Sequence, residues 1–182
     1  PDLTLVAEAS NGSEALELYR EHLPDVVTMD FQLPGADGAA TTAALRVEFP
    51  DAHVLLLSVF EGEEDIWRAV QAGALGYVPK SAEIAEVLEG IRELARGREY
   101  FPAAIASRLN ARRSRDTLSP RELQVLRAIV GGCSNKEISS SLHLSEAAVK
   151  LYISNTLAKL GVADRTQAAI QAIRRGIVHL DD

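Results

Sequence analysis

Three residues with charged or hydroxyl side chains each follow a short apolar run in the first half of the chain: Asp30, Ser58 and Lys80. Together they would supply a carboxylate, a hydroxyl and an ammonium group. A carboxylate can act as a nucleophile and form a covalent phosphoryl intermediate. The ammonium group can balance the charge of the phosphoryl oxygens, and the hydroxyl can donate a hydrogen bond to them. This combination predicts phosphoryl transfer to Asp30, provided that the fold brings the three side chains together.

The elements around these residues predict that they do meet. Short apolar runs, typical of strands, alternate with segments of helical periodicity. The predicted strands are 3–9, 25–30, 53–59 and 76–80, and the predicted helices are 13–22, 38–49, 63–73 and 82–94. This alternation indicates βαβ units in an α/β, doubly wound parallel sheet, and the nearly continuous apolar strands indicate helices on both faces. Because ligands of such sheets lie beyond the carboxyl ends of the strands, Asp30, Ser58 and Lys80 are expected at one edge.

The chain turns directly after Asp30. A turn at Leu33-Pro34-Gly35 would keep the carboxylate exposed, because it prevents a helix from starting at once. Taken singly, each of the three residues has an ordinary explanation, since an acid at the end of a strand is usually a solvated loop group. Their order at the ends of three successive predicted strands is what favours a site.

The charge of the chain changes sign along its length. Residues 1–107 contain 7 Lys and Arg against 19 Asp and Glu, whereas residues 108–182 contain 12 against 7. This asymmetry predicts two modules with different partners, of which the basic one is the candidate for nucleic acid. We expect modules at 1–98 and 117–182 with a linker at 99–116. The linker has a basic stretch that is either solvated or in contact with DNA, formed by Arg108, Arg112, Arg113 and Arg115.

Bulk properties exclude several other classes of protein. A hydrophobic content of 47% with a balanced mean hydropathy predicts a soluble globular protein. No apolar run approaches the roughly 18 residues that a membrane span needs, and the chain opens without a signal peptide. The single cysteine, Cys133, excludes an internal disulfide and a cysteine zinc cluster and fits a reducing compartment. We therefore expect a cytoplasmic protein without a membrane partner.

The second module is predicted to contain four helices and no strand. The helices should begin near 120 and then span 135–142, 146–160 and 164–175. Each follows a residue with a short polar side chain of the kind that favours the N-cap position: Ser119, Ser134, Ser145 and Asp164. Glu122 and Glu137 complete capping boxes for the first two, and Gly161 ends the third helix.

Residues 134–161 are predicted to form a helix, a tight turn and a second helix. Four residues recur on one face of the second helix and should pack inward: Val149, Ile153, Thr156 and Leu160. Lys150, Leu151, Ser154 and Lys159 lie off this stripe. Outward groups of this kind on a second helix can contact guanine, a phosphate or a thymine methyl group in the major groove. The alternative is that this face is simply the solvated side of an ordinary helix.

Three segments of the first module carry a resemblance to a known family. "DVVTMDFQLPGADG" (25–38), "VLLLSV" (54–59) and "GALGYVPKSA" (73–82) resemble the receiver domain of two-component response regulators over residues 1–95. The resemblance implies that Asp30 is the phospho-acceptor, Ser58 the switch hydroxyl, Lys80 the phosphate-reading lysine and Tyr77 the rotating aromatic residue. It also implies a sensor histidine kinase as partner, and Mg²⁺ held by Asp30 and the backbone carbonyl of Gln32.

One departure from this family concerns its first strand and helix. Receivers begin with a strand that ends in a pair of Mg²⁺-binding acids, whereas this chain opens at what corresponds to the second strand, residues 3–9. In the family the first strand lies between the strands at 3–9 and 25–30, so its loss would leave two buried edges unpaired. Two explanations stay open. Either residues upstream of Pro1 supply the strand, which we favour, or the receiver is degenerate and is not phosphorylated.

The second module resembles the LuxR-type output domain of the NarL/FixJ family over residues 117–180. The resemblance rests on "LSPRELQVL", "GCSNKEIS", "LSEAAVK" and "NTLAKLGVADRTQAA". It implies contact with double-stranded DNA through base-reading positions at Lys150, Leu151 and Ser154. It places a second group near the DNA backbone: Asn135, Lys136, Asn155, Lys159 and Arg165. It further implies that the last helix pairs two copies on DNA through Ala168, Ala169, Ala172 and Ile173.

These features predict a DNA-binding response regulator that controls transcription and is switched by phosphorylation of Asp30. Phosphorylation would favour a form in which the receiver releases the DNA-binding helix or dimerises. The alternative is a transcription factor whose receiver no longer accepts phosphate. An aspartyl-phosphate phosphatase of the haloacid dehalogenase type is disfavoured, because that class uses Asp-x-Asp and Gln32 occupies the second acidic position. We therefore do not expect an enzyme.

Overall fold

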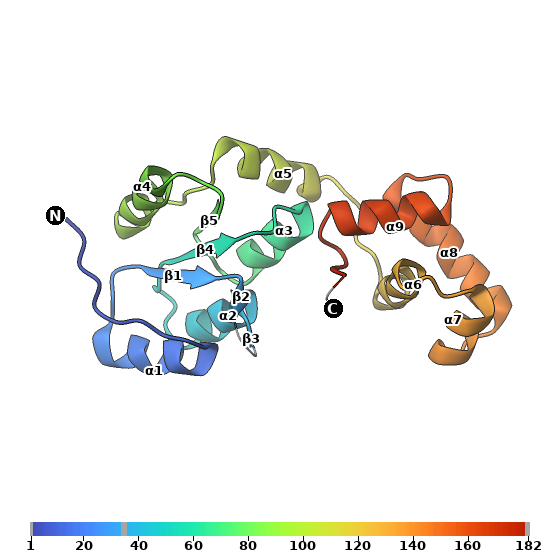
Figure 1. Cartoon of the computed structure of the whole chain (residues 1–182), viewed down its shortest axis with the longest axis horizontal. Helices are drawn as coiled ribbons and strands as arrows, with labels where there is room; N and C mark the ends of the chain where they lie inside the picture. The colour runs from blue at the N-terminus through green and yellow to red at the C-terminus, as the bar shows by residue number, and fades with distance from the viewer. Residues whose placement is uncertain (1, 34–35, 181–182) are drawn as a thin grey trace. The chain divides into compact units, whose positions relative to one another are not determined.

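The computed structural model describes residues 2–33 and 36–180, which form two compact units (Figure 1). The first unit, Pro1–Leu109, contains the β-strands, and the second, Asn110–Asp182, contains helices. The division falls close to the point at which the sequence changes from acidic to basic. Each unit is described by itself below.

A three-stranded parallel sheet forms the centre of the first unit. Its strands are β1 (Val27–Asp30), β4 (Val54–Ser58) and β5 (Gly76–Pro79), in the order β1-β4-β5. The middle strand β4 is almost wholly buried, as expected for a strand with helices on both faces. The strands predicted at 25–30, 53–59 and 76–80 are therefore confirmed with slightly shorter bounds.

Helices cover both faces of this sheet. α1 (Gly12–His22), α2 (Gly38–Glu48) and α3 (Glu63–Gln71) lie on one face, and α4 (Ile84–Ala95) lies on the other (Figure 1). Alternate residues of β4 serve the two sides, because side chains along a strand point to opposite faces. One core contains Val54 and Leu56 with Tyr19, Leu45, Ile66 and Tyr77, and the other contains Leu55 with Val78 and Leu94.

The start of α2 is fixed against the end of β1. Asp37 is the N-cap residue of α2, and its side chain accepts a hydrogen bond of 2.8 Å from the backbone N–H of Ala39. A Cβ atom at position 38 would lie 2.0 Å from the backbone oxygen of Asp30. Gly38 therefore permits an approach of helix to strand that no other residue allows, and this contact positions the backbone of Asp30.

A short antiparallel hairpin follows β1. It consists of β2 (Gln32–Leu33) and β3 (Ala36–Asp37), with Gln32 opposite Asp37. The turn predicted at Leu33-Pro34-Gly35 falls partly outside the described residues, since Pro34 and Gly35 are not among them. In the sequence the hairpin lies between Asp30 and the start of α2.

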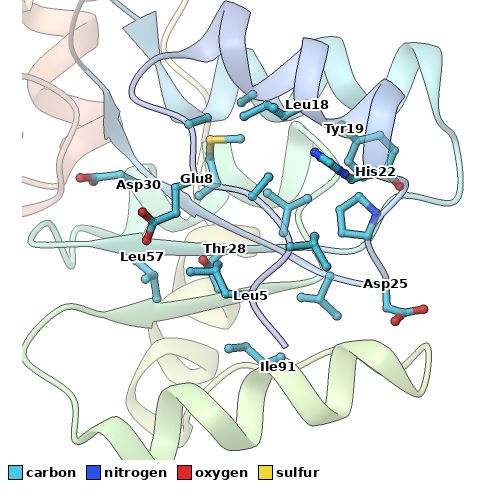
Figure 2. Close-up of a pocket in the computed structure, with 18 of the residues that line it drawn as sticks. Leu5, Glu8, Leu18, Tyr19, His22, Asp25, Thr28, Asp30, Leu57 and Ile91 are labelled. Carbon is cyan, nitrogen blue, oxygen red and sulfur yellow. The ribbon is translucent and has the colours of Figure 1, made fainter. Parts of the chain in front are cut away.

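The strand predicted at 3–9 is wrong, because these residues form no strand. A strand requires a neighbour with which it exchanges backbone hydrogen bonds, and no residue within 2–33 or 36–180 pairs with this segment. A cavity of about 1070 Å³ is lined by this segment on one side and by β1 on another (Figure 2). The apolar side chains of Leu5 and Val6 are consequently 73% and 52% exposed.

A helix that the sequence analysis did not identify lies within the linker predicted at 99–116. This helix, α5 (Ala103–Arg113), buries Ile105 and Leu109 in the larger core of the first unit. Arg108, on the same helix, bonds to the backbone oxygen and the carboxylate of Glu61 at 2.6 Å. The first part of the expected linker is thus packed onto the first unit.

The second unit consists of α6 (Pro120–Val130), α7 (Asn135–Leu142), α8 (Glu146–Leu160) and α9 (Arg165–Arg174). Every predicted N-cap is confirmed, and the boxes that begin at Ser119 and Ser134 both form. Gly161 ends α8 with a φ of 70°, a left-handed conformation that favours glycine. Two apolar clusters join the helices, one around Leu126, Leu160 and Ala172 and the other around Ile129, Ile138 and Val149.

The predicted fold class is therefore confirmed: an α/β unit with a parallel sheet followed by a helical unit with a helix-turn-helix. Among the helices of residues 2–33 and 36–180, none has both the length and the apolar character that a membrane crossing requires.

Candidate functional site

Asp30 and Lys80 meet at the carboxyl edge of the sheet. Asp30 is the last residue of β1, and Lys80 follows β5 on the far side of β4. The Oδ2 atom of Asp30 lies 2.5 Å from the Nζ atom of Lys80. The Oδ1 atom accepts a hydrogen bond of 3.0 Å from the backbone N–H of Gln32. Both side chains remain partly exposed, 33% for Asp30 and 41% for Lys80, so the pair is open to a ligand from solvent.

Ser58 lies between these two residues, at the end of the middle strand. The backbone N–H of Lys80 donates to the carbonyl of Ser58 at 2.7 Å, which holds the lysine at this edge. The Ser58 side chain is only 1% exposed, and its Oγ atom accepts a hydrogen bond of 2.9 Å from the backbone N–H of Phe60. The three residues are thus neighbours at one edge, but the hydroxyl faces inward rather than toward solvent.

Tyr77 is fully buried beneath this edge. Its hydroxyl donates to the carbonyl of Phe60 at 2.7 Å. Burial raises the pKa of the Tyr77 hydroxyl, and this effect outweighs the hydrogen bond with Ser58 that lowers the pKa. The phenol is therefore neutral and remains a hydrogen-bond donor at physiological pH. Ser58 and Tyr77 both bond to Phe60, which links the edge of the sheet to the inward position of the ring.

The cavity beside β1 reaches this site. Asp30 and Lys80 are among the residues that line it, together with Glu8. Figure 2 shows Glu8 and Asp30 at the same end of the cavity, with His22 and Asp25 at the other. Apolar side chains also line the cavity, among them Leu5, Leu18, Leu57 and Ile91.

The described residues do not assemble a ligand set for Mg²⁺. This ion prefers six oxygen ligands, supplied by one or two carboxylates together with waters and phosphate oxygens. Within residues 2–33 and 36–180, no three acidic, histidine or cysteine side chains gather in a way that could hold a metal. The Asp30 carboxylate is already paired with Lys80.

Sequence reasoning did not identify Arg68, which contacts the loop after Asp30. Arg68 lies on α3, forms an ion pair with Asp37 and places its guanidinium 5.4 Å from the centre of the Phe31 ring. The two partners precede Arg68 by more than 30 positions in the sequence. No local pattern around residue 68 signals the contact, because it arises only when α3 packs beside the hairpin.

In the second unit, α8 presents the outward groups that the sequence predicts. Val149, Thr156 and Leu160 are buried and Ile153 is partly buried, which confirms the inward stripe. Leu151 is 61% exposed. The neighbouring residues on its face are exposed as well, and they are Lys150, Ser154 and Asn155. One exposed face of α8 therefore combines a cationic group (Lys150), a hydrogen-bonding group (Ser154) and an apolar group (Leu151).

Two of the cationic residues expected near DNA have partners inside the second unit. Lys159 bonds to the Glu122 carboxylate at 2.7 Å and to the carbonyl of Thr117 at 3.2 Å. Arg165 donates to the carbonyl of Cys133 at 2.6 Å. These contacts join α8 to α6 and α9 to the α6–α7 turn. On α7, Lys136 is exposed and Asn135 is partly buried.

The predicted pairing face of α9 needs correction. Ala168 and Ala172 are fully buried in the core of the second unit, and Ala169 packs against a neighbouring cluster. These alanines face inward because the helix uses its small residues to approach α6 and α8. Ile173 is 40% exposed, and Ile170, which the sequence analysis did not select, is 51% exposed. The apolar surface of α9 that remains available is formed by this isoleucine pair.

Comparison with known proteins shows two matching family models. Residues 2–92 match the "Response regulator receiver domain", and residues 116–172 match "Bacterial regulatory proteins, luxR family". The chain is 35% identical over 187 residues to the transcriptional regulatory protein LiaR of Bacillus subtilis, with 98% of this chain and 89% of LiaR covered. It is 32% identical to the response regulator protein VraR of Staphylococcus aureus, with 97% and 87% covered.

Solved structures give the same picture. The response regulator ChrA of a heme-sensing two-component system is 36% identical, with a TM-score of 0.52 over 97% of this chain and 87% of ChrA. The RcsB response regulator of Salmonella typhimurium is 20% identical, with a TM-score of 0.69 over 92% of this chain and 84% of RcsB. At that identity the likeness to RcsB shows the fold.

The contact between Lys159 and Glu122 makes a prediction about acid stability. The Glu122 side chain is 6% exposed. Burial pushes its pKa upward, but hydrogen bonds from Lys159 and Ser119 outweigh this effect and hold the pKa below the ordinary value of 4.5. Because the folded pKa is depressed, the stabilisation is present above pH 4.5 and is lost as the pH falls through the folded pKa.

The substitution Lys159→Met should raise the pKa of Glu122. As the pH is lowered, the second unit should therefore unfold at a higher pH than in the wild type. The substitution should also lower the free energy of unfolding at neutral pH by about 1–3 kcal/mol, because the buried carboxylate loses a charged partner. The side-chain carbon shift of Glu122, followed by NMR against pH, measures the pKa directly. Lys136→Met is the matched control and should leave it unchanged. An unaltered Glu122 pKa in Lys159→Met would contradict the assigned contact.

Proposed function

The chain belongs to the response regulators that join a receiver domain to a LuxR-type DNA-binding domain, and on this premise we propose that phosphorylation of Asp30 controls DNA binding by α8. The observation that carries the proposal is the pairing of Asp30 with Lys80 at the carboxyl edge of the sheet. The receiver is proposed at 1–98 and the DNA-binding domain at 117–182, with the linker between them.

In the proposed reaction a carboxylate oxygen of Asp30 attacks the phosphorus of a phosphohistidine on a sensor kinase. A new O–P bond forms as the N–P bond to the histidine breaks, and the imidazole leaves with the electron pair. The acyl phosphate carries more negative charge than the carboxylate it replaces. Lys80 is the cation that faces this charge, because its ammonium group already contacts the Asp30 carboxylate. Hydrogen bonds between an ammonium group and phosphoryl oxygens are strong.

In this structure the two proposed switch residues, Ser58 and Tyr77, form hydrogen bonds with Phe60. Ser58 accepts from the Phe60 amide, and the Tyr77 hydroxyl donates to the Phe60 carbonyl. In the proposed switch, the Ser58 hydroxyl turns to donate to a phosphoryl oxygen. The contact between Ser58 and Phe60 would then be lost, and the segment that also holds Tyr77 would move with it. The two states differ in defined hydrogen bonds, which a population shift requires.

Phosphorylation of receiver domains typically uses Mg²⁺. Asp30 and the carbonyl of Gln32 are the atoms proposed to face it. A second candidate function is favoured by the absence of a metal-binding cluster in the part of the chain described. In that case the protein is a transcription factor whose DNA binding does not depend on phosphate.

DNA is proposed as the partner of α8. Lys150, Leu151 and Ser154 are proposed to contact bases, and the basic charge of the second unit supports attraction to phosphates. RcsB, which shares the fold, has been solved in complexes with DNA, including one of two RcsB dimers bound to two parallel DNAs. By analogy two copies of this chain would pair on a duplex, with Ile170 and Ile173 as the apolar contact. We place the protein in the cytoplasm, where its kinase and DNA partners meet.

Incubation of the chain with acetyl phosphate tests the phospho-acceptor. The intact mass should increase by one phosphoryl group in the wild type, because the Asp30 carboxylate is partly exposed beside Lys80. The gain should disappear in Asp30→Asn and persist in Asp25→Asn, which alters an exposed acid just before the same strand. Parallel samples with Mg²⁺ and with EDTA show whether the metal is needed. No mass gain in either sample, measured on protein that includes any residues preceding Pro1, would refute the proposal and favour the phosphate-independent factor.

A second experiment tests the DNA interface with a duplex selected from a random pool by the wild-type protein. Lys150→Ala should weaken binding to this duplex by about 1–3 kcal/mol and relax specificity at one base pair if Lys150 contacts a base. Arg174→Ala removes the same charge from α9 and should change the binding free energy much less. Equal losses in the two variants would show that α8 is not the reading helix.

A further inference from the structure

Arg68 connects α3 to the residue just before the hairpin that follows Asp30 and to the last residue of that hairpin. It forms an ion pair with Asp37, the N-cap residue of α2, and its guanidinium lies 5.4 Å from the centre of the Phe31 ring. Phe31 directly follows Asp30 in the sequence. One side chain of α3 therefore contacts both ends of residues 31–37, which directly follow the proposed phospho-acceptor.

Phe31 is held in place on several sides. Its side chain is 4% exposed, and its ring meets the Tyr77 ring edge-to-face, with centres 6.1 Å apart and planes inclined by 68°. Its backbone N–H donates to the carbonyl of Leu57 at 2.8 Å, and its carbonyl accepts from Gly38 at 2.9 Å. The Phe31 ring thus contacts both the guanidinium of Arg68 and the aromatic ring of Tyr77. A displacement of Phe31 would alter both contacts.

An arginine suits both contacts at once. The guanidinium is planar, so its edge can pair with a carboxylate while its face lies over an aromatic ring, whereas a lysine ammonium group acts as a point charge. Each contact is weak at this partly exposed position, since the side chains of Arg68 and Asp37 are 44% and 35% exposed. Together the two contacts can favour one position of α3 while leaving a second position accessible. A helix that changes between two states needs contacts of this modest strength.

We propose that Arg68 is a positioning residue that ties α3 to the loop after Asp30, so that the state of Asp30 is transmitted to α3 through Phe31 and Asp37. The contacts of Arg68 with Phe31 and Asp37, which we call the tether, are present in the unphosphorylated chain. The transmission to α3 rests on the proposed function, because it depends on phosphorylation of Asp30.

The chain provides its own reporter for α3. Trp67 is the single tryptophan, lies next to Arg68 and is partly buried against the core of the first unit. Its emission reports the environment of α3, and hydrogen exchange of the amides in Glu63–Gln71 reports how often the helix opens. Neither measurement requires phosphorylation, so the tether can be tested independently.

In the unphosphorylated chain, Arg68→Ala should speed exchange in α3 by about 3- to 30-fold, the factor expected from losing one exposed ion pair and one cation–π contact. Arg68→Lys should lie between the wild type and Arg68→Ala, because it keeps the charge but not the planar group. Asp37→Asn removes the ion pair while keeping an N-cap residue of similar quality, and it should also speed exchange. Arg20→Ala, which breaks the exposed Arg20–Glu48 pair, is the matched control and should leave α3 unchanged.

After acetyl phosphate treatment, the change in Trp67 emission per phosphoryl group should be smaller in Arg68→Ala than in the wild type, while the gain in mass stays the same. Exchange in α3 that is equal in the wild type, Arg68→Ala and Asp37→Asn would overturn the tether. An equal emission change per phosphoryl group in the wild type and Arg68→Ala would overturn the transmission. No mass gain in the wild type would refute the proposed function and the transmission, and the exchange comparison would still decide the tether. If Arg68→Ala fails to fold by circular dichroism, Asp37→Asn carries the same test.

Discussion

Asp30 pairs with Leu57 in the register between β1 and β4, and Ser58 pairs with Pro79 in the register between β4 and β5. These two parallel registers place a carboxylate, a hydroxyl and the lysine after β5 at one edge, although 50 residues of sequence separate the first from the last. If one strand shifted by one residue along its neighbour, every side chain of that strand would move to the opposite face of the sheet. The buried residues of β4 prevent such a shift, because Val54 and Leu56 fill one core and Leu55 fills the other. The chemistry of the edge therefore depends on apolar packing in the middle of the sheet.

The same edge connects the site to the rest of the first unit. Gly38 allows α2 to begin against the backbone of Asp30, and Asp37 caps that helix while it pairs with Arg68 of α3. Ser58 and Tyr77 share Phe60 as a hydrogen-bonding partner. In the proposed switch, the Ser58 hydroxyl would donate to a phosphoryl group on Asp30, and the contact between Ser58 and Phe60 would be lost. The proposed switch would therefore exchange the contacts seen here for a second set around the phosphoryl group.

Much of this arrangement could be predicted from local sequence. The predicted N-cap residues begin their helices, namely Ser119, Ser134, Ser145 and Asp164, and Gly161 ends α8.

The features that local sequence did not predict are those that depend on a partner far away in the chain. Residues 3–9 have the composition of a strand, but no residue in the part of the chain that the structure describes pairs with them. Ala168 and Ala172 lie on a small-residue face that suits a dimer equally well, and the packing of α9 against the second unit's own core buries them. The ion pair between Lys159 and Glu122 could not be predicted either, because Glu122 lies within reach only after α6 and α8 pack. The contacts of Arg68 have the same origin, since Phe31 and Asp37 belong to another part of the chain.

We propose that the charge at residue 30 controls how tightly α8 binds a DNA duplex. The measurement that tests it most directly is the affinity of the chain for its selected duplex, determined at one salt concentration before and after full phosphorylation by acetyl phosphate. We expect binding to tighten by about 5- to 150-fold, the range of a typical coupling between two sites, and we expect no change in Asp30→Asn. An affinity that stays the same in a sample shown by mass to carry the phosphoryl group would contradict the account.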